Sequence, residues 1–276
     1  MKNLVSAEWL KNNTDKENLV ILDVRYVLGD GGYGKKEYEK GHIPNAVFIP
    51  LEEILTGEIK EHGGRHPLPN MEEFTCNMNN IGVDDKSTAV IYDDGDLSMA
   101  GRLWWMLRYV GHGESYVLSG GYKGWESKNY PVSTNAPEIR KADKLTFNLQ
   151  KNMIADINAA KKAVLAEDQV LVDSRTGDRY RGEIEPIDRI PGHIPGAVNL
   201  PWTDLSEYNS NTDITEIKKH FKSVEGYNKI IVHCGSGITG TVNILFMEEA
   251  ELSPELYVGG YSDWISYPEN EVVTEI

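Results

Sequence analysis

The sequence contains the same series of motifs twice, and this internal repeat restricts the possible folds more than any other feature. An apolar run that ends in Asp-x-Arg occurs at 19–25 (LVILDVR) and again at 170–175 (VLVDSR). GHIPNAVFIP, which begins at Gly41, returns as GHIPGAVNLP, which begins at Gly192. AVIYDD is matched by IIVHCG, and VLSGGYKGW by YVGGYSDW. Because the order is unchanged, we expect a duplicated domain.

Each half alternates apolar runs with helical patterns. Strands that alternate with helices indicate βαβ units, so we expect an α/β fold in which each half is a mostly parallel sheet with helices on both faces. Helices are expected at 6–12, 71–79, 99–110, 157–165, 214–221 and 241–249. The polar stretch 132–144 lacks periodicity, and we expect it to link a domain at 1–131 to a second domain at 145–276.

The segment VHCGSGITG, residues 232–240, joins a β-branched run to a helical pattern that predicts an amphipathic helix. Cys234 is therefore expected at the carboxyl end of a buried parallel strand, below converging backbone N–H groups and at the positive end of the helix. Gly235 and Gly237 would let the loop turn its amides inward, and Thr239 would cap the helix. This environment favours a thiolate, the nucleophilic form of cysteine.

The loop sequence Cys-Gly-Ser-Gly-Ile-Thr, residues 234–239, together with the repeat, resembles the rhodanese sulfurtransferase family over essentially the whole chain. The resemblance implies two tandem rhodanese-like domains and a persulfide carried by Cys234. This neutral loop looks like the 3-mercaptopyruvate branch, whereas the thiosulfate branch more typically has basic residues after the cysteine. In the first half Asp93 stands in the cysteine position. A carboxylate cannot carry a sulfane sulfur, so we expect the first domain to be catalytically silent.

The resemblance also implies which residues bind the substrate. Arg179 matches the arginine of the family's Arg-Phe/Tyr motif, which binds the substrate carboxylate or sulfonate, and Arg189 stands where mercaptopyruvate-type relatives often have a second arginine. Arginine suits this role because its planar group can hold a carboxylate by two hydrogen bonds. In such relatives the histidine that matches His42 reaches the interdomain cleft. The loop itself is expected to bind developing negative charge through Gly235, Ser236, Gly237, Ile238 and Thr239.

The hypothesis that follows is two-step nucleophilic catalysis. A small anionic donor, 3-mercaptopyruvate or thiosulfate, gives a sulfane sulfur to Cys234. The persulfide then passes its outer sulfur to cyanide, a small thiol or a thioredoxin-like protein. No metal or organic cofactor is required. We expect 3-mercaptopyruvate to be preferred, because Gly235 and Ser236 carry no positive charge for the thiosulfate dianion.

Two alternatives belong to other functional classes. A cysteine phosphatase would carry His-Cys-x5-Arg, but the residue in the arginine position is Gly240, which counts against phosphate chemistry. A noncatalytic rhodanese-like module for binding or regulation fits the first half, which lacks the cysteine. It does not fit the second half, where the loop after Cys234 is intact.

Composition excludes several partners. The net charge of −15 and the pI near 4.9 argue against binding to nucleic acid or to an anionic membrane. The sequence has no apolar run long enough to span a membrane, and its first residues lack the apolar core of a signal peptide. Two cysteines, Cys76 and Cys234, are too few for a disulfide framework, which fits a cytoplasmic protein.

Several polar residues are expected to have structural roles. Asp23 and Asp173 should pair with Arg25 and Arg175 at the ends of their strands. The histidines of the second half, His193 and His233, should serve packing, and Cys76 should pack within its helix.

Overall fold

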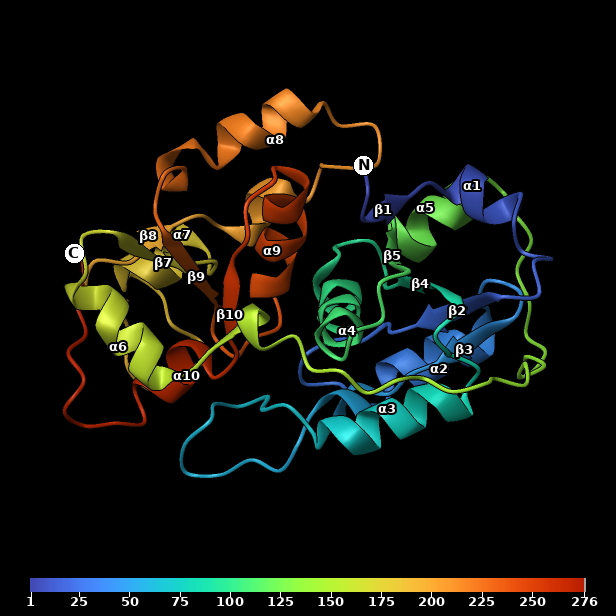
Figure 1. The fold of residues 1–276 in the computed structure, drawn as a ribbon, viewed down its shortest axis with the longest axis horizontal. Coiled ribbons are helices and arrows are strands. Elements are labelled where there is room, and N and C mark those ends of the chain that lie inside the picture. Colours follow the sequence, from blue (N-terminus) through green and yellow to red (C-terminus); the bar gives the residue numbers. More distant parts are fainter. Residues whose placement is uncertain (276) are drawn as a thin grey trace. The chain divides into compact units, whose positions relative to one another are not determined.

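The structure is a computed structural model that describes residues 1–275, and these fold into two compact units (Figure 1). The first unit consists of Met1–Gly57, Leu68–Gln150 and Asn209–Asn211. The second consists of Glu58–Pro67, Lys151–Tyr208 and the chain from Thr212 onward. A short segment of the first sequence half, 58–67, therefore belongs to the second unit. Residues 132–144 form no helix or strand beyond an isolated bridge between Ser133 and His42, and they group with the first unit.

Each unit is built on a five-stranded sheet in which every pair of strands is parallel. In the first sheet the order is β1 (Leu4–Val5), β5 (Ser115–Leu118), β4 (Thr88–Tyr92), β2 (Leu19–Asp23) and β3 (Ala46–Phe48). In the second sheet it is β6 (Ile154–Ala155), β10 (Glu255–Tyr257), β9 (Lys229–His233), β7 (Gln169–Asp173) and β8 (Val198–Asn199). The predicted α/β class and the predicted repeat are confirmed, and β4 and β9 are the corresponding central strands.

The six helices expected from the sequence are all present. They are α1 (Ala7–Lys11), α3 (Met71–Asn80), α4 (Ser98–Tyr109), α6 (Ile157–Leu165), α8 (Ile214–His220) and α9 (Gly240–Glu249). Four helices were not expected, namely α2 (Tyr33–Lys40), α5 (Gly121–Ser127), α7 (Gly177–Arg181) and α10 (Gly260–Trp264). These four are short and contain glycine, so their sequences lack the regular spacing of apolar residues that predicts a helix.

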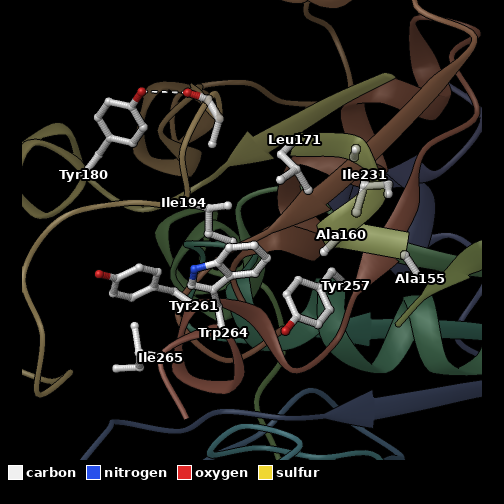
Figure 2. Packing of buried hydrophobic residues seen from close by; sticks show 12 residues of the cluster. Ala155, Ala160, Leu171, Tyr180, Ile194, Ile231, Tyr257, Tyr261, Trp264 and Ile265 are labelled. Carbon is white, nitrogen blue, oxygen red and sulfur yellow. Dashed lines mark hydrogen bonds between the residues drawn. The ribbon is translucent and has the colours of Figure 1, made fainter. Parts of the chain in front are cut away.

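The core of the second unit lies where α6 and α10 pack on one face of the sheet. Figure 2 shows this buried cluster, which includes Tyr261 and Trp264 from α10, Leu171 and Ile231 from the central strands and Ala160 of α6. Helix α9 lies on the opposite side of the sheet from α6 (Figure 1). Both faces of the sheet are thus covered by helices, as a buried parallel sheet requires.

The prediction of an amphipathic α9 is wrong, because its polar residues are buried as well. Thr241 and Asn243 are fully buried, along with the apolar residues between and after them. The Asn243 side-chain amide donates to Ser174 Oγ and to the carbonyl oxygen of Leu200, each at 2.7 Å. These hydrogen bonds offset the cost of burying a polar group, so the helix can be enclosed on all sides.

Each Asp-x-Arg motif ties the end of a strand to the following Gly-His-Ile-Pro turn, which confirms the predicted pairing. Arg25 Nη2 donates to Asp23 Oδ2 at 2.7 Å and to the carbonyl oxygen of Gly41 at 2.8 Å. In the second unit, Arg175 Nη2 makes the same two bonds, to Asp173 and Gly192, at 2.6 and 2.7 Å. Both arginines are almost fully buried, so the motif is a structural element of the fold.

Replacing Arg25 by Met should lower the free energy of unfolding of the first unit by about 3 kcal/mol, because Asp23 would remain as an unpaired buried charge. Urea unfolding followed by circular dichroism would measure the change. Lys40→Met, which removes an exposed pair with Glu37, is the matched control and should leave the midpoint nearly unchanged. Equal effects of the two variants would contradict this role of the motif.

Candidate functional site

Cys234 directly follows the central strand β9, and its side chain is buried with 2% of the residue exposed. The two carbonyl groups at the start of its loop are held by α10: Cys234 O accepts from Tyr261 N–H at 2.8 Å, and Gly235 O accepts from Ser262 N–H at 2.9 Å. Gly237 has a φ of +74°, and a Cβ there would lie 2.3 Å from the carbonyl oxygen that follows β10. The loop conformation therefore requires glycine at this position.

The end of the loop differs in one detail from the prediction. Thr239 occupies the position before the first turn of α9, but its side chain makes no capping hydrogen bond. The capping prediction is wrong because the φ and ψ of Thr239 are already helical, whereas a capping residue has an extended backbone. Instead, Thr241 Oγ1 donates to the carbonyl oxygen of Ile238 at 2.6 Å. Ile238 and Ser236 are both buried, as Cys234 is.

Two guanidinium groups lie beside Gly235, the residue next to the cysteine. A Cβ built on Gly235 would lie 2.9 Å from Arg65 Nη2, 3.6 Å from Arg179 Nη2 and 3.6 Å from Asp188 Oδ2. Arg179 was expected near the loop from the sequence. Arg65 and Asp188 were not singled out, and they supply a second cation and a carboxylate at the same place.

These groups belong to a chain of six alternating charges, which we call the ion-pair network: Asp173, Arg175, Glu185, Arg179, Asp188 and Arg65. Arg175 Nη1 contacts Glu185 Oε2 at 3.2 Å, and Arg179 Nη2 contacts Glu185 Oε1 at 2.8 Å. Arg179 Nη2 also contacts Asp188 Oδ2 at 3.0 Å, while Asp188 Oδ1 is paired with Arg65. Three positive charges thus face three negative charges, and Arg65 is the end with the most exposed side chain, at 31%.

The two acidic residues that hold Arg179 differ in how firmly they keep their charge. Burial raises the pKa of the Glu185 carboxyl, but hydrogen bonds from Arg179 and from backbone N–H groups reverse this effect and leave its pKa below the ordinary value. For Asp188, burial is the stronger effect and raises the pKa, although Arg65 and Arg179 act in the opposite direction. Glu185 is therefore the permanent partner of Arg179, and Asp188 is the weaker one.

A second polar pair lies on the loop, where His66 Nδ1 is 2.7 Å from Ser236 Oγ. His66 and Arg65 both come from the segment 58–67. From His42 to the start of α3 the chain covers 29 positions, whereas from His193 to the start of α8 it covers 21, so the first half is eight residues longer in the stretch that contains this segment. A comparison of the repeats could not find it. The available signal was its composition, Gly-Gly-Arg-His-Pro in an acidic chain.

The histidine predicted to reach a cleft is instead enclosed by its own unit. His42 is 1% exposed, and its ring stacks on Tyr38 with centroids 3.9 Å apart. Its Nδ1 lies 2.8 Å from the carbonyl oxygen of Tyr38, and its Nε2 lies 3.0 Å from that of Asn135. Both ring nitrogens therefore face backbone acceptors, as expected for a structural histidine. His193 has a similar stack, on Tyr180.

Arg189, the other predicted anion ligand, is not among the three groups nearest to Gly235. Its Nη2 donates to the carbonyl oxygen of Ile265. It lines a cavity of ≈ 350 Å³ whose walls also include Arg65 and Asp188. The structure thus brings Arg179 to the loop and places Arg189 in a neighbouring hollow.

The loop of the first unit shows what replaces the cysteine. The Asp93 carboxylate accepts hydrogen bonds from the backbone N–H groups of Gly95, Leu97 and Ala100, at 2.8, 3.3 and 3.1 Å. The side chain therefore fills the anion-binding position of its own loop. Burial, reinforced by the nearby charge of Asp96, raises the pKa of Asp93 to about 7.

His233 and Cys76, which were both expected to serve packing, differ in their exposure. His233 is fully buried, with Nδ1 3.3 Å from the Cys234 carbonyl oxygen, as expected for a structural residue. Cys76 was expected to pack, but it is exposed on α3. Among residues 1–275 there is no group of three or more acidic, cysteine or histidine side chains that could hold a metal ion. In the same part of the chain, no helix is long and apolar enough to cross a membrane.

Comparison with known proteins decides the family. The model of the Rhodanese-like domain matches residues 6–128 and again residues 156–267. The chain belongs to the rhodanese family. Each match covers one half of the repeat, so both halves are rhodanese-like domains.

The relatives are sulfurtransferases that match over nearly their whole length. A probable 3-mercaptopyruvate sulfurtransferase from Pseudomonas aeruginosa is 33% identical over 280 residues, covering 98% of each chain. The 3-mercaptopyruvate sulfurtransferase of Escherichia coli is 32% identical over 272 residues, covering 94% of each chain. The crystal structure of SseA from Escherichia coli, described as a 3-mercaptopyruvate sulfotransferase, has a TM-score of 0.82 at 30% identity and covers 95% of this chain and 100% of its own. This rhodanese is accordingly an enzyme that transfers sulfur from a donor to an acceptor.

The raised pKa of Asp93 predicts a pH-dependent stability of the first unit. A carboxyl group whose pKa is higher in the folded state stabilises the fold fully below its unfolded pKa of 3.8, and this contribution is lost as the pH rises through about 7. Between pH 5 and pH 8 the wild-type protein should therefore lose more free energy of unfolding than Asp93→Asn, by more than about 1.4 kcal/mol, the equivalent of one pKa unit. Urea unfolding at both pH values measures the difference. Asp15→Asn, at an exposed site, is the control, and parallel profiles for wild type and Asp93→Asn would refute the prediction.

Proposed function

We propose that this rhodanese takes the sulfane sulfur of 3-mercaptopyruvate, and less efficiently that of thiosulfate, and carries it as a persulfide on Cys234. The observation that supports this most is the pair of guanidinium groups of Arg65 and Arg179 beside Gly235. A donor held there by its anionic end would have its sulfur next to the nucleophile. A noncatalytic binding module would not require a cysteine next to two guanidinium groups.

The two arginines have N–H groups available for a donor anion. Among residues 1–275, no hydrogen-bond partner is found for Arg65 Nη2 or for Arg179 Nη1. Glu185 holds the other edge of Arg179 through Nε and Nη2, at 2.8 to 3.1 Å, so the guanidinium plane is fixed before substrate arrives. Because the guanidinium group is already held in place, little conformational entropy is lost when its N–H groups bind an anion.

In the proposed reaction the Cys234 thiolate attacks the sulfur of 3-mercaptopyruvate. An S–S bond forms, the C–S bond breaks, and its electron pair stays on carbon as the enolate of pyruvate. The proton carried by the donor thiol ends on that carbon, so the products are pyruvate and the enzyme persulfide. The loop from Gly235 to Thr239 would stabilise the negative outer sulfur through its backbone N–H groups.

Ser236 is placed to assist the leaving group. Its hydroxyl can donate to the keto oxygen that becomes the enolate, and His66, 2.7 Å away, can hold or exchange the hydroxyl proton. Thiosulfate has no keto group and gains nothing from this pair. The Ser236–His66 contact therefore supports a higher kcat/KM for 3-mercaptopyruvate than for thiosulfate.

The second half-reaction returns the enzyme to its thiolate form. We propose cyanide, a small thiol or a thioredoxin-like protein as the acceptor that attacks the outer sulfur of the persulfide. Both cysteines, Cys76 and Cys234, are free, which is compatible with action in the reducing cytoplasm.

The direct test uses the two cysteines as a matched pair. Cys234→Ser should abolish sulfur transfer from either donor, while Cys76→Ser should keep the wild-type rate, because Cys76 is exposed on α3 and outside the site. Peptide mass spectrometry after donor treatment should show one added sulfur on the Cys234 peptide. Steady-state kinetics should give the higher kcat/KM with 3-mercaptopyruvate. Labelling of the more accessible Cys76 alone, or a Cys234→Ser variant that still turns over, would overturn the proposal.

Arg179 provides the second test. Arg179→Ala should lower kcat/KM for both donors by roughly 100-fold, as expected when a charged hydrogen bond of about 3 kcal/mol is removed. Arg179→Lys should recover only part of this loss, since a point charge cannot reproduce the planar geometry. Arg181→Ala, which removes an exposed arginine from the same helix, is the control and should behave as wild type. Full activity in Arg179→Ala would show that the anion is bound elsewhere.

A further inference from the structure

The ion-pair network contains one carboxylate whose position is not explained by holding the fold together. Asp188 lies between the two arginines that face Gly235, with Oδ1 on Arg65 and Oδ2 on Arg179, and its side chain is 2% exposed. Arg179 is already held by both oxygens of Glu185, so it does not need Asp188 for its orientation. What Asp188 adds at this place is a negative charge beside the position proposed for the donor anion.

We propose that Asp188 is a specificity-determining residue: its charge sets the anion site to accept a monoanionic donor and to disfavour a dianionic one. This inference rests on the function proposed above. The network with Asp188 ionised has no net charge, since three arginines face three carboxylates. A monoanion then brings one uncompensated charge into a buried site, whereas a dianion brings two.

The effect on specificity follows from the number of charges on the donor. Removing the charge of Asp188 makes the electrostatic potential at the site more positive, and a dianion gains about twice as much from this change as a monoanion. The neutral residues Gly235 and Ser236 are therefore only part of the reason to expect 3-mercaptopyruvate. Two cations do lie next to the loop, and the carboxylate between them limits how much negative charge they can attract.

A comparison of the two halves of the repeat shows that Asp188 lies in an insertion of the second half. Tyr38 and Tyr180 are equivalent, since each stacks on the histidine of its Gly-His-Ile-Pro turn and donates its hydroxyl to a backbone carbonyl at 2.6 Å. Four positions separate Tyr38 from His42, but 13 separate Tyr180 from His193, so the second half has nine more residues here. That insertion contains both Glu185 and Asp188, and the arginine that they bind, Arg179, stands where the first half has Glu37. The cation and its counter-charges therefore occur together in the catalytic half.

The test compares Asp188→Asn, which keeps the shape and removes the charge, with Asp188→Glu, which keeps the charge. For each, kcat/KM is measured with thiosulfate and with 3-mercaptopyruvate. Asp188→Asn should raise the ratio of thiosulfate to 3-mercaptopyruvate by at least about tenfold, and the rise should shrink at high salt, where charges are screened. Asp188→Glu should stay within about threefold of wild type. Glu183→Gln, in the same segment but paired with the exposed Arg181, is the matched control and should leave the ratio unchanged.

A second variant keeps the test informative if Asp188→Asn does not fold. Arg65→Gln removes a positive charge from the other side of Asp188 and should move the ratio in the opposite direction. An unchanged ratio in Asp188→Asn, or an equal loss with both donors, would overturn the proposal and leave Asp188 a purely structural residue. In that case the persulfide on Cys234 would still form, so the proposed function would stand.

A binding measurement separates the two proposals if neither donor loads Cys234. In the Cys234→Ser background, calorimetry with thiosulfate and with pyruvate reports the affinity of the site for a dianion and for a monoanion without any chemistry. Adding Asp188→Asn should strengthen the binding of thiosulfate more than that of pyruvate. Equal changes for both ions would contradict the role of Asp188.

Discussion

The structure around Cys234 depends on the mutual neutralisation of buried charges in the ion-pair network. Arginines can be buried only where carboxylates balance them, because an unpaired charge in the interior costs several kcal/mol. Asp173 fixes Arg175 at the end of a central strand, Arg175 shares Glu185 with Arg179, and Asp188 continues the alternation to Arg65. One end of this chain is part of the fold and the other end is part of the site. The positions of the two guanidinium groups beside Gly235 therefore depend on ion pairs that begin at the end of β7.

The loop that follows the central strand differs between the two units. In the first unit the loop after the central strand donates three N–H groups to the carboxylate of Asp93, so its capacity to bind an anion is already used. In the second unit the corresponding position holds Cys234, so no carboxylate occupies this loop. The duplicated units therefore share a scaffold but differ in the loop that follows the central strand, DDGDLSMA at 93–100 and CGSGITGT at 234–241.

Much of this could be predicted from the sequence, because the repeat and the apolar runs are local patterns. The parallel sheets and the place of Cys234 follow from motif order and strand direction, whereas Arg179 was singled out by its resemblance to the arginine motif of the family. Other features depend on contacts between distant residues: Asn243 is buried because Ser174 accepts its hydrogen bond. Arg65 comes from a stretch in which the first half is eight residues longer than the second, so a comparison of the repeats did not place it beside Gly235.

The segment 58–67 makes the duplicated halves dependent on each other. A tandem repeat of this kind is normally divisible, since each copy carries its own sheet and core. Here Arg65 and His66 belong to the first half of the sequence, yet their side chains contact Asp188 and Ser236 in the second unit. A second half separated at residues 132–144 would keep Cys234 but would lose the guanidinium group of Arg65 and the histidine beside Ser236. A cut at residues 132–144 would therefore divide the contacts beside Gly235 between two separate chains.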